Sequence, residues 1–467
     1  MSDSQPELAK EQGDSPSFEL DTDQVDEIVD ALDAADFAAV RKLCAPLHYA
    51  DVADLLEWLS TADRLRLLDV LGDDLDHDSL AELDDNVRDE ILEHWGLDNI
   101  VQAVTNLDSD DAVDFIEDLD EENKRKVLDA IPAEDRTFIL ESLKYPEDSA
   151  GRLMQRELVT VPEFWTVGKT IDFMRQSAED APDSLPEFFY DIYVVDPQHK
   201  PIGAVGLSSL LRTRRPVKIT EVMWEQMLIV PITMDQEDVA YLFRQRDLVS
   251  APVVDENGRL VGAITIDDIV DVIDDEHEED MMLLAGVGED DLYDAALDTT
   301  RSRFVWLAVN LLTAVLASAV ISLFEATIEQ IVALAVLMPI VASMGGNAGT
   351  QTLTVAVRGL ATKELTATNA TRVIMKELLV GSINGVLFAV IAGCVAWLWF
   401  DDIALGLVIA LAMVVNMTIA GLAGTSIPIL LERAGADPAI ASSVFVTTVT
   451  DVVGFFAFLG LAALIML

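Results

Sequence analysis

The chain has 467 residues, of which 83 are Asp or Glu and 30 are Lys or Arg, so its formal net charge at pH 7 is −53. This acidity argues against a nucleic-acid-binding protein, because phosphate backbones are bound mainly by Lys and Arg. The two cysteines, Cys44 and Cys394, fall in a polar and an apolar part of the chain. No disulfide framework is therefore expected, and a reducing compartment suits the polar part.

Charge divides the chain into two halves. Residues 300–467 contain 9 Asp or Glu and 7 Lys or Arg, so nearly all of the negative charge lies in residues 1–299. The excess acidity has two compatible explanations: solvation in a high-salt cell, and carboxylates that bind divalent cations. Residues 1–21 are polar and acidic, show no cleavable signal peptide, and are predicted to be a disordered tail.

A helical repeat is predicted for residues 22–145. The segment Val113-Asp-Phe-Ile-Glu-Asp-Leu-Asp120 aligns without gaps on Ala53-Asp-Leu-Leu-Glu-Trp-Leu-Ser60. Apolar residues recur at spacings of three and four, as in amphipathic helices. The pattern indicates helical hairpins stacked into an all-α superhelical domain.

An α/β repeat is predicted for residues 146–273. Residues 153–162 match residues 222–231, and the segment 253–262 has the pattern of a strand, a tight turn and a second strand. A helix is expected to follow from Asp267.

The doubled pattern resembles a tandem cystathionine-β-synthase-type (CBS) domain pair. Such pairs often bind adenine nucleotides through a Ser or Thr followed three residues later by Asp. The second copy has Thr265 and Asp268 at these positions, whereas the first has Gly206 and Ser209. The resemblance implies at most one site, for ATP or another adenine nucleotide. The alternative is a CBS pair that serves only as a dimer scaffold and hinge.

An acidic linker helix is predicted for residues 274–300, which contain Asp274-Asp-Glu-His-Glu-Glu-Asp280 and Glu289-Asp-Asp291. The carboxylates that share one helical face are Asp271, Asp275, Glu278 and Glu279. Like charges four residues apart destabilise a helix by about 0.2–0.5 kcal/mol per pair, and bound cations would relieve this. The alternative is a solvated acidic linker.

Five apolar segments in residues 301–467 can each reach the roughly 20 residues that span a bilayer. They run approximately over residues 304–323, 328–343, 378–400, 403–422 and 439–467. The second is short, and the sequence permits its continuation past the glycines that follow. Basic residues precede the first segment and lie between the second and third; they are Arg301, Arg303, Arg358, Lys363, Arg372 and Lys376. The positive-inside rule therefore predicts a multi-pass protein of the cell (inner) membrane, with cytoplasmic soluble domains and an outer C-terminus.

The last apolar segment contains a carboxylate, Asp451, beside the hydroxyls of Thr447, Thr448 and Thr450. A charged side chain at the bilayer centre costs about 2.5–3.5 kcal/mol on insertion scales, so such a residue usually faces a cavity or a pore. Oxygen ligands suit hard cations, which indicates an ion path. The alternative is a helix end that reaches water.

The second apolar segment leads into a run of small and polar residues: Gly345, Gly346, Asn347 and Gly349. These residues permit an unwound helix, which at membrane depth must line a cavity. The alternative is close packing of small residues against a neighbouring helix. Asn416 and Thr418, in the fourth segment, are interpreted as interhelical hydrogen-bonding groups.

These parts, in this order, resemble the MgtE family of magnesium channels and transporters over nearly the whole chain from about Asp30. The local motifs that carry the resemblance are Tyr145-Pro-Glu-Asp-Ser-Ala-Gly-Arg-Leu-Met154, Gly345-Gly-Asn-Ala-Gly349 and Ala436-Asp-Pro-Ala439. Together they are specific, although each alone is a weak signal.

The resemblance implies a homodimer with a pore between its two membrane domains and Asp451 as the pore aspartate. The residues that it places along the pore are Gly345, Gly346, Asn347, Gly349, Ser443 and Thr447, with Asp437 at the cytosolic mouth. The cytosolic Mg²⁺-sensing carboxylates that it implies are Asp235, Asp268, Asp271, Glu276, Glu279 and Asp280. Residues 274–300 correspond to the family's plug helix. Ser443 is a departure, since some members carry Asn there.

The predicted fold is a multidomain protein with an all-α N-terminal domain, an α/β CBS pair, a linker helix and a five-helix transmembrane domain. The predicted function is a Mg²⁺-selective channel or transporter, driven by the membrane potential, that imports Mg²⁺. Cytosolic Mg²⁺ bound between the acidic elements is expected to close it. No enzyme activity is expected. The alternatives are a non-conducting membrane sensor of nucleotide or cation levels and another CBS-regulated divalent-cation transporter.

Overall fold

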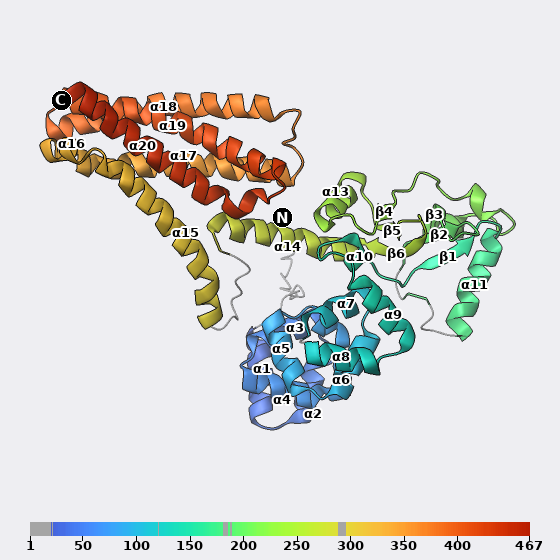
Figure 1. Ribbon diagram of the computed structural model, residues 1–467. Helices are drawn as coiled ribbons and strands as arrows, with labels where there is room; N and C mark the ends of the chain where they lie inside the picture. Colours follow the sequence, from blue (N-terminus) through green and yellow to red (C-terminus); the bar gives the residue numbers. More distant parts are fainter. Residues whose placement is uncertain (1–19, 21, 120, 181–184, 187–188, 288–295) are drawn as a thin grey trace, which may run out of the picture. The chain divides into compact units, whose positions relative to one another are not determined.

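A computed structural model describes residues 20, 22–119, 121–180, 185–186, 189–287 and 296–467 (Figure 1). The chain divides into two compact units, Met1–Val272 and Ile273–Leu467. Apart from Leu20, the predicted tail and the acidic run Glu289-Asp-Asp291 lie outside the described residues.

The first unit begins with a run of short α-helices. They are α1 (Thr22–Asp33), α2 (Phe37–Cys44), α3 (Tyr49–Trp58), α4 (Thr61–Leu71), α5 (Asp85–His94), α6 (Leu97–Asn106), α7 (Ser109–Asp118), α8 (Glu121–Ala130) and α9 (Ala133–Ser142). The 3-10 helices η1 (Gly72–Asp74) and η2 (His77–Leu80) precede α5. Polar side chains cap several of these helices; Ser60, for example, accepts a hydrogen bond from the backbone N–H of Asp63. Apolar residues of all nine helices share one core, which confirms the predicted all-α domain.

The second part of this unit contains two three-stranded sheets of the same design. The first has the order β1 (Val159–Pro162), β2 (Asp191–Val195), β3 (Pro201–Gly206), and the second has the order β4 (Val230–Pro231), β5 (Ser250–Val254), β6 (Leu260–Thr265). In each sheet the first pair is parallel and the second is an antiparallel hairpin. The helices of this part are α10 (Ala150–Leu153), α11 (Val167–Asp180), α12 (Leu207–Arg212), η4 (Ile219–Glu221) and α13 (Gln236–Arg246). The predicted α/β repeat is therefore present.

The two copies also exchange backbone hydrogen bonds. Gln155, near the start of the first copy, pairs with Ala263 of β6, at N–O distances of 2.8 and 2.9 Å. Trp224, near the start of the second copy, pairs with Ala204 of β3 in the same manner. Each copy thus adds a bridge residue to the edge of the other copy's sheet, so backbone hydrogen bonds join the two copies.

The predicted helix after β6 is α14 (Ile266–Ala285), which begins within one residue of the predicted start. It is continuous from the second CBS copy into the acidic linker, so the linker helix is an extension of a CBS helix. Its first residues belong to the first compact unit and its remainder to the second.

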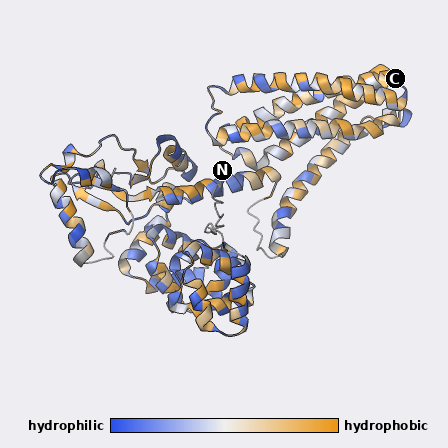
Figure 2. Cartoon of the chain, turned by 180° about the vertical axis from the view of Figure 1, so that it is seen from behind, coloured by the Kyte–Doolittle hydropathy of each residue, from blue (hydrophilic) through white to orange (hydrophobic). Residues whose placement is uncertain are grey.

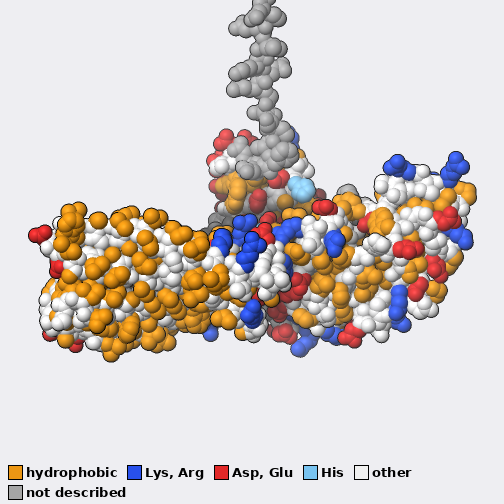
Figure 3. All heavy atoms as spheres, turned by 90° about the horizontal axis from the view of Figure 1, so that it is seen from above, with side chains coloured by type: hydrophobic (Ala, Val, Ile, Leu, Met, Phe, Trp, Pro, Cys, Tyr) orange, Lys and Arg blue, Asp and Glu red, His pale blue; other side chains and the backbone are white. Residues whose placement is uncertain are grey.

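The second unit contains long apolar helices. They are α15 (Ala296–Ser322), the short α16 (Glu325–Gln330), α17 (Ala333–Ala361), α18 (Ala370–Phe400), α19 (Ile403–Arg433) and α20 (Pro438–Met466). Five described helices are long and apolar enough to cross a membrane. Their surfaces are dominated by exposed aliphatic and aromatic side chains, in contrast to the mixed surface of the helical domain (Figures 2 and 3). This pattern is typical of helices that contact lipid.

Several span boundaries differ from those expected from hydropathy. Residues 328–330 belong to α16, and the second span begins at Ala333 and continues past its glycines to Ala361. The third span begins at Ala370, and the fourth continues to Arg433. Hydropathy missed these ends because the extra helical turns carry charged residues such as Arg372 and Glu432.

Candidate functional site

Asp451 lies in the middle of α20, where its side chain is half-buried. The neighbouring threonine hydroxyls donate to carbonyls of their own helix: Thr448 to Val444 at 2.6 Å and Thr450 to Thr447 at 2.9 Å. Because each hydroxyl oxygen keeps lone pairs after donating, these threonines remain able to accept hydrogen bonds on the same helix as the carboxylate. A half-buried carboxylate among neutral oxygens suits a hydrated hard cation.

Gly345 and Gly349 of α17 pack against other helices. A Cβ atom on Gly345 would overlap the Asn416 amide, and one on Gly349 would lie 2.6 Å from Cγ1 of Val446. The helix is continuous from Ala333 to Ala361, so the expected unwound segment is wrong and the small-residue packing alternative holds. Close packing explains the outcome: unwinding would expose backbone groups and lose these contacts.

Asn416 of α19 joins three helices of the membrane domain. Its side chain is fully buried, and its Nδ2 donates to the backbone carbonyl of Val341 on α17, at 2.8 Å. Gly345 of α17 and Gly454 of α20 both leave room for its amide. Its Oδ1 has no hydrogen-bond partner among the described residues. Gly454 lies one turn after Asp451, so Asn416 fixes the helices near the carboxylate.

The other residues that the resemblance places along a pore lie on α17 and α20. Asn347 is exposed and its Nδ2 donates to the Ser343 carbonyl, at 2.8 Å. Ser443 and Thr447 are half-buried, and the Thr447 hydroxyl donates to the Ser443 carbonyl, at 3.0 Å. Gly346 has open space beside it.

The end of α14 packs on the membrane helices. Leu283 is buried in a cluster with Leu353 of α17 and with Ala439 and Val446 of α20. Burial and the nearby carboxylate of Asp437 raise the pKa of Asp280. Asp437 caps α20 by accepting a hydrogen bond from the Ala439 N–H, at 2.6 Å. Two of the predicted metal-binding carboxylates, Asp280 and Asp437, are therefore neighbours at the first turn of α20.

A second carboxylate group forms in the first unit, between the helical domain and the second CBS copy. Burial and the charge of Asp268 raise the pKa of Asp111 to about 7, and the same two causes raise that of Asp110 well above its usual range. The pKa of Asp268 itself rises to about 6, chiefly through burial. Burial and mutual repulsion therefore disfavour the simultaneous ionisation of these three carboxylates.

Asp110 and Asp111 were not predicted as site residues. They lie at the first turn of α7, where acidic residues are common, and no local signal separates them from the other acidic residues of this domain. Only their proximity to Asp268, at the start of α14, identifies them.

The remaining predicted carboxylates lie on α14 and at the start of α13, and the charge of Asp271 contributes to the raised pKa of Asp268. The charge of Asp271 contributes, after burial, to a raised pKa of Glu82 in the helical domain. Asp235 caps α13 and adds, again after burial, to the raised pKa of Asp148. Glu276 and Glu279 lie on α14, half-buried and exposed respectively. Within the part of the chain that the structure describes, no three His, Cys, Asp or Glu side chains form a ready-made metal site.

The predicted nucleotide pair makes an internal contact. The Thr265 hydroxyl donates to Asp268 Oδ2, at 2.8 Å, and the Thr265 N–H donates to the same oxygen, at 3.2 Å. Asp268 therefore caps the start of α14 and also faces Asp110 and Asp111. This carboxylate has a structural role that needs no nucleotide.

Comparison with known families covers most of the chain. A model described as a divalent cation transporter matches residues 338–461, the MgtE intracellular N domain matches residues 47–148, and a CBS domain matches residues 219–275. These matches fall on the membrane helices, the helical domain and the second CBS copy respectively.

Individual proteins are similar over nearly their full length. The magnesium transporter MgtE of Bacillus subtilis is 31% identical over 423 residues, which cover 90% of this chain and 93% of that protein. The magnesium transporter MgtE of Thermus thermophilus is 33% identical over 445 residues, covering 94% and 97%. A crystal structure of the cytosolic domain of the Mg²⁺ channel MgtE in complex with ATP is 30% identical, with a TM-score of 0.49, and covers 53% of this chain and 99% of that chain.

Proposed function

This chain belongs to the MgtE family of magnesium transporters, and from that premise we propose that it imports Mg²⁺ through a pore that contains Asp451. The observation that carries the proposal is a half-buried carboxylate in the middle of a helix that is long and apolar enough to span a membrane. A non-conducting sensor has no use for such a residue, which costs about 2.5–3.5 kcal/mol to insert.

The chemistry of the site suits Mg²⁺. This ion dehydrates reluctantly and is usually held by one or two carboxylates while it keeps several waters. In a homodimer, two copies of Asp451 meet at one axis and hold a hydrated ion weakly enough to release it. The membrane potential supplies the driving force, since moving a divalent charge across 100 mV yields about 4.6 kcal/mol.

The cytosolic carboxylates act as the gate. Without Mg²⁺, the group of Asp110, Asp111 and Asp268 and the pair of Asp280 and Asp437 repel within themselves. Bound Mg²⁺ removes the repulsion and stabilises a closed arrangement of the helical domain, the CBS pair and the linker helix, with the end of α14 packed on α17 and α20. Moving a two-state equilibrium from 1:99 to 99:1 needs about 5.5 kcal/mol, which four sites of roughly 1.4 kcal/mol each supply.

The same proposal places the soluble domains in the cytoplasm and the C-terminus outside, with five spans per subunit of a homodimer. The CBS pair acts chiefly as a scaffold and hinge. An adenine nucleotide at Thr265 and Asp268 must compete with their mutual hydrogen bond.

The gating is tested by Mg²⁺ influx into liposomes under an imposed potential. The full chain is compared with a chain that lacks residues 1–272, at low and high internal Mg²⁺. We expect both to conduct at low internal Mg²⁺ and only the full chain to shut down at high internal Mg²⁺. Shutdown that persists in the truncated chain contradicts the proposed gate. An absence of influx from the full chain at low internal Mg²⁺ favours the sensor alternative.

A further inference from the structure

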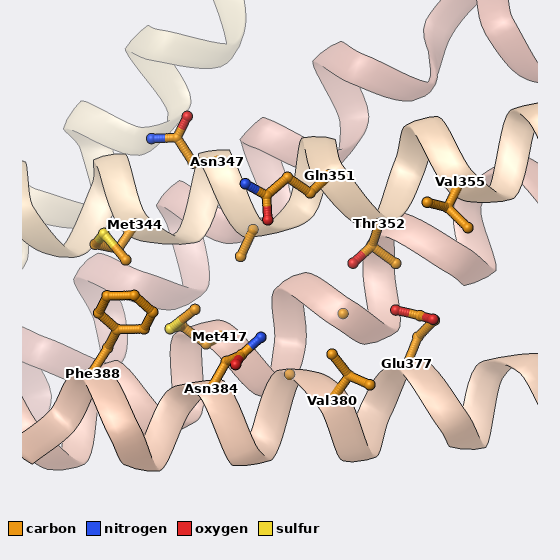
Figure 4. A pocket seen from close by; sticks show the side chains of 13 residues that line it. Met344, Asn347, Gln351, Thr352, Val355, Glu377, Val380, Asn384, Phe388 and Met417 are labelled. Carbon is orange, nitrogen blue, oxygen red and sulfur yellow. The ribbon is translucent and has the colours of Figure 1, made fainter.

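The membrane domain contains a pocket with apolar and polar lining residues, of which Asp451 is not one. It has a volume of about 300 Å³ and lies between α17, α18 and α19. The polar side chains that point into it are Gln351 and Thr352 of α17 and Glu377 and Asn384 of α18, whereas Asn347 points away from them (Figure 4). Glu377 and Asn384 are seven residues apart and therefore lie on one face of α18.

The floor of the pocket is a close crossing of α18 and α19. A Cβ atom on Gly381 would lie 2.5 Å from the carbonyl oxygen of Met417, and one on Gly421 would lie 2.6 Å from the carbonyl oxygen of Glu377. The two glycines therefore bring the helix backbones together below the cavity. The polar side chains lie on the pocket side of this crossing. The shape of the pocket is therefore set by the close packing of α18 on α19.

Glu377 is the one charged residue among those that line the pocket in the described chain. Its side chain is 12% exposed, and its Oε1 lies 3.2 Å from Nζ of Lys376, whose side chain is 68% exposed. An ion pair with so exposed a partner contributes little. The carboxylate therefore still lacks a strong counter-charge inside the pocket.

We propose that this pocket binds a hydrated divalent cation, with Glu377 as its carboxylate and with Gln351, Thr352 and Asn384 as neutral oxygen partners. The single carboxylate and the absence of a lining Lys, Arg or His, among the residues described, exclude an anion. A cavity of about 300 Å³ holds an ion together with several waters, each occupying about 30 Å³. Such retained hydration is typical of Mg²⁺.

This cation site is additional to the proposed ion path past Asp451. Its physiological role rests on the proposed function. It is tested with Mn²⁺, a paramagnetic divalent ion, and the full-length protein carrying ¹³C-methyl methionine. Met344 and Met417 line the pocket, so Mn²⁺ bound there broadens their methyl signals. Each signal is assigned by a Met→Leu substitution.

We expect Mn²⁺ to broaden both signals in the wild type and in Asp451→Asn. In Glu377→Gln the apparent affinity should fall about tenfold or more. Asn384→Ala should weaken binding by a smaller factor, and Lys376→Gln should bind at least as well as the wild type. Unaffected methionine signals elsewhere in each variant show that it is folded.

Three results would overturn the site: no broadening in the wild type, broadening that Glu377→Gln leaves unchanged, or broadening that Asp451→Asn abolishes. Binding and flux are separate measurements. Broadening in a protein that conducts no Mg²⁺ would leave this site standing and refute the proposed function. Mg²⁺ flux in a protein whose Met344 and Met417 signals Mn²⁺ does not broaden would refute this site and leave the proposed function standing.

Discussion

The side-chain amide of Asn416 donates a hydrogen bond to the backbone carbonyl of Val341, at 2.8 Å, and so ties α19 to α17. The amide fits there because the residues that face it on α17 and α20, Gly345 and Gly454, have no side chain. An interhelical hydrogen bond in a membrane contributes about 0.6 kcal/mol on average. Its greater effect is to set the spacing of α17 and α20.

The first prediction concerns adjacent glycines of α17. Gly345→Ala should destabilise the membrane domain, because the new methyl group overlaps the Asn416 amide and displaces it from Val341. Gly346→Ala is the matched control, because nothing lies within 4 Å of its added Cβ, and Ala is favoured over Gly in helices by about 1 kcal/mol. Thermal unfolding of the detergent-solubilised protein should show a lower Tm for Gly345→Ala alone. Equal Tm values for the two variants would contradict the packing described.

The second prediction concerns pH in the absence of divalent cations. The pKa of Asp111 is raised from 3.8 to about 7, so its contribution to stability is fully present below about pH 4 and is lost as the pH rises through 7. The docking of the helical domain on the CBS pair should therefore weaken across this range. Hydrogen exchange of the α7 amides measures it. Added Mg²⁺ at pH 7.5 should restore protection.

Two variants make this pH test specific. Asp111→Asn cannot ionise, so the pH dependence of α7 protection should become shallower. Asp98→Asn removes an exposed carboxylate from the neighbouring helix α6 and should leave the dependence unchanged. A wild-type protein whose α7 protection is independent of pH and of Mg²⁺ would show that these carboxylates do not control the docking.

The third prediction concerns an ion pair between the helical domain and the entry to the CBS pair. The Arg152 guanidinium pairs with Glu117 and donates to the Tyr145 carbonyl, at 3.1 Å, and its side chain is only 14% exposed. Arg152→Ala should reduce protection of α7 by about 1–3 kcal/mol, because the partner groups are left unsatisfied.

The control for this pair is an exposed one. Arg215→Ala removes an ion pair to Asp172 in which both side chains are more than half exposed, at 52% and 63%, so its cost should stay within about 1 kcal/mol. If hydrogen exchange shows that Arg152→Ala and Arg215→Ala lower the free energy of local unfolding by the same amount, burial does not decide the strength of these ion pairs.

Local patterns in the sequence were sufficient for most of the fold. Apolar periodicity predicted the helical domain, and the repeated strand–turn–strand motif predicted both sheets and the start of α14 near Asp267. The interhelical role of Asn416 was also predicted, since a buried amide in a membrane helix needs a partner. The helices and strands follow from residues that are close in the sequence, and the role of Asn416 follows from the need of a buried polar group for a hydrogen-bond partner.

Other features could not be predicted because they depend on tertiary packing. The glycines at Gly345 and Gly349 are compatible with an unwound or a close-packed helix, and only the neighbours Asn416 and Val446 decide for packing. The carboxylates Asp110 and Asp111 become distinctive only beside Asp268, which lies far away in the sequence. The pocket at Glu377 likewise needs three helices.

The central claim is that Mg²⁺ crosses the membrane past Asp451. The most direct measurement is Mg²⁺ influx into liposomes at low internal Mg²⁺ and a fixed potential, for the wild type, Asp451→Asn and Glu329→Gln. The last variant removes the same charge from the exposed helix α16. We predict influx in the wild type and in Glu329→Gln, and its near-complete loss in Asp451→Asn. Influx that Asp451→Asn leaves unchanged would contradict the account.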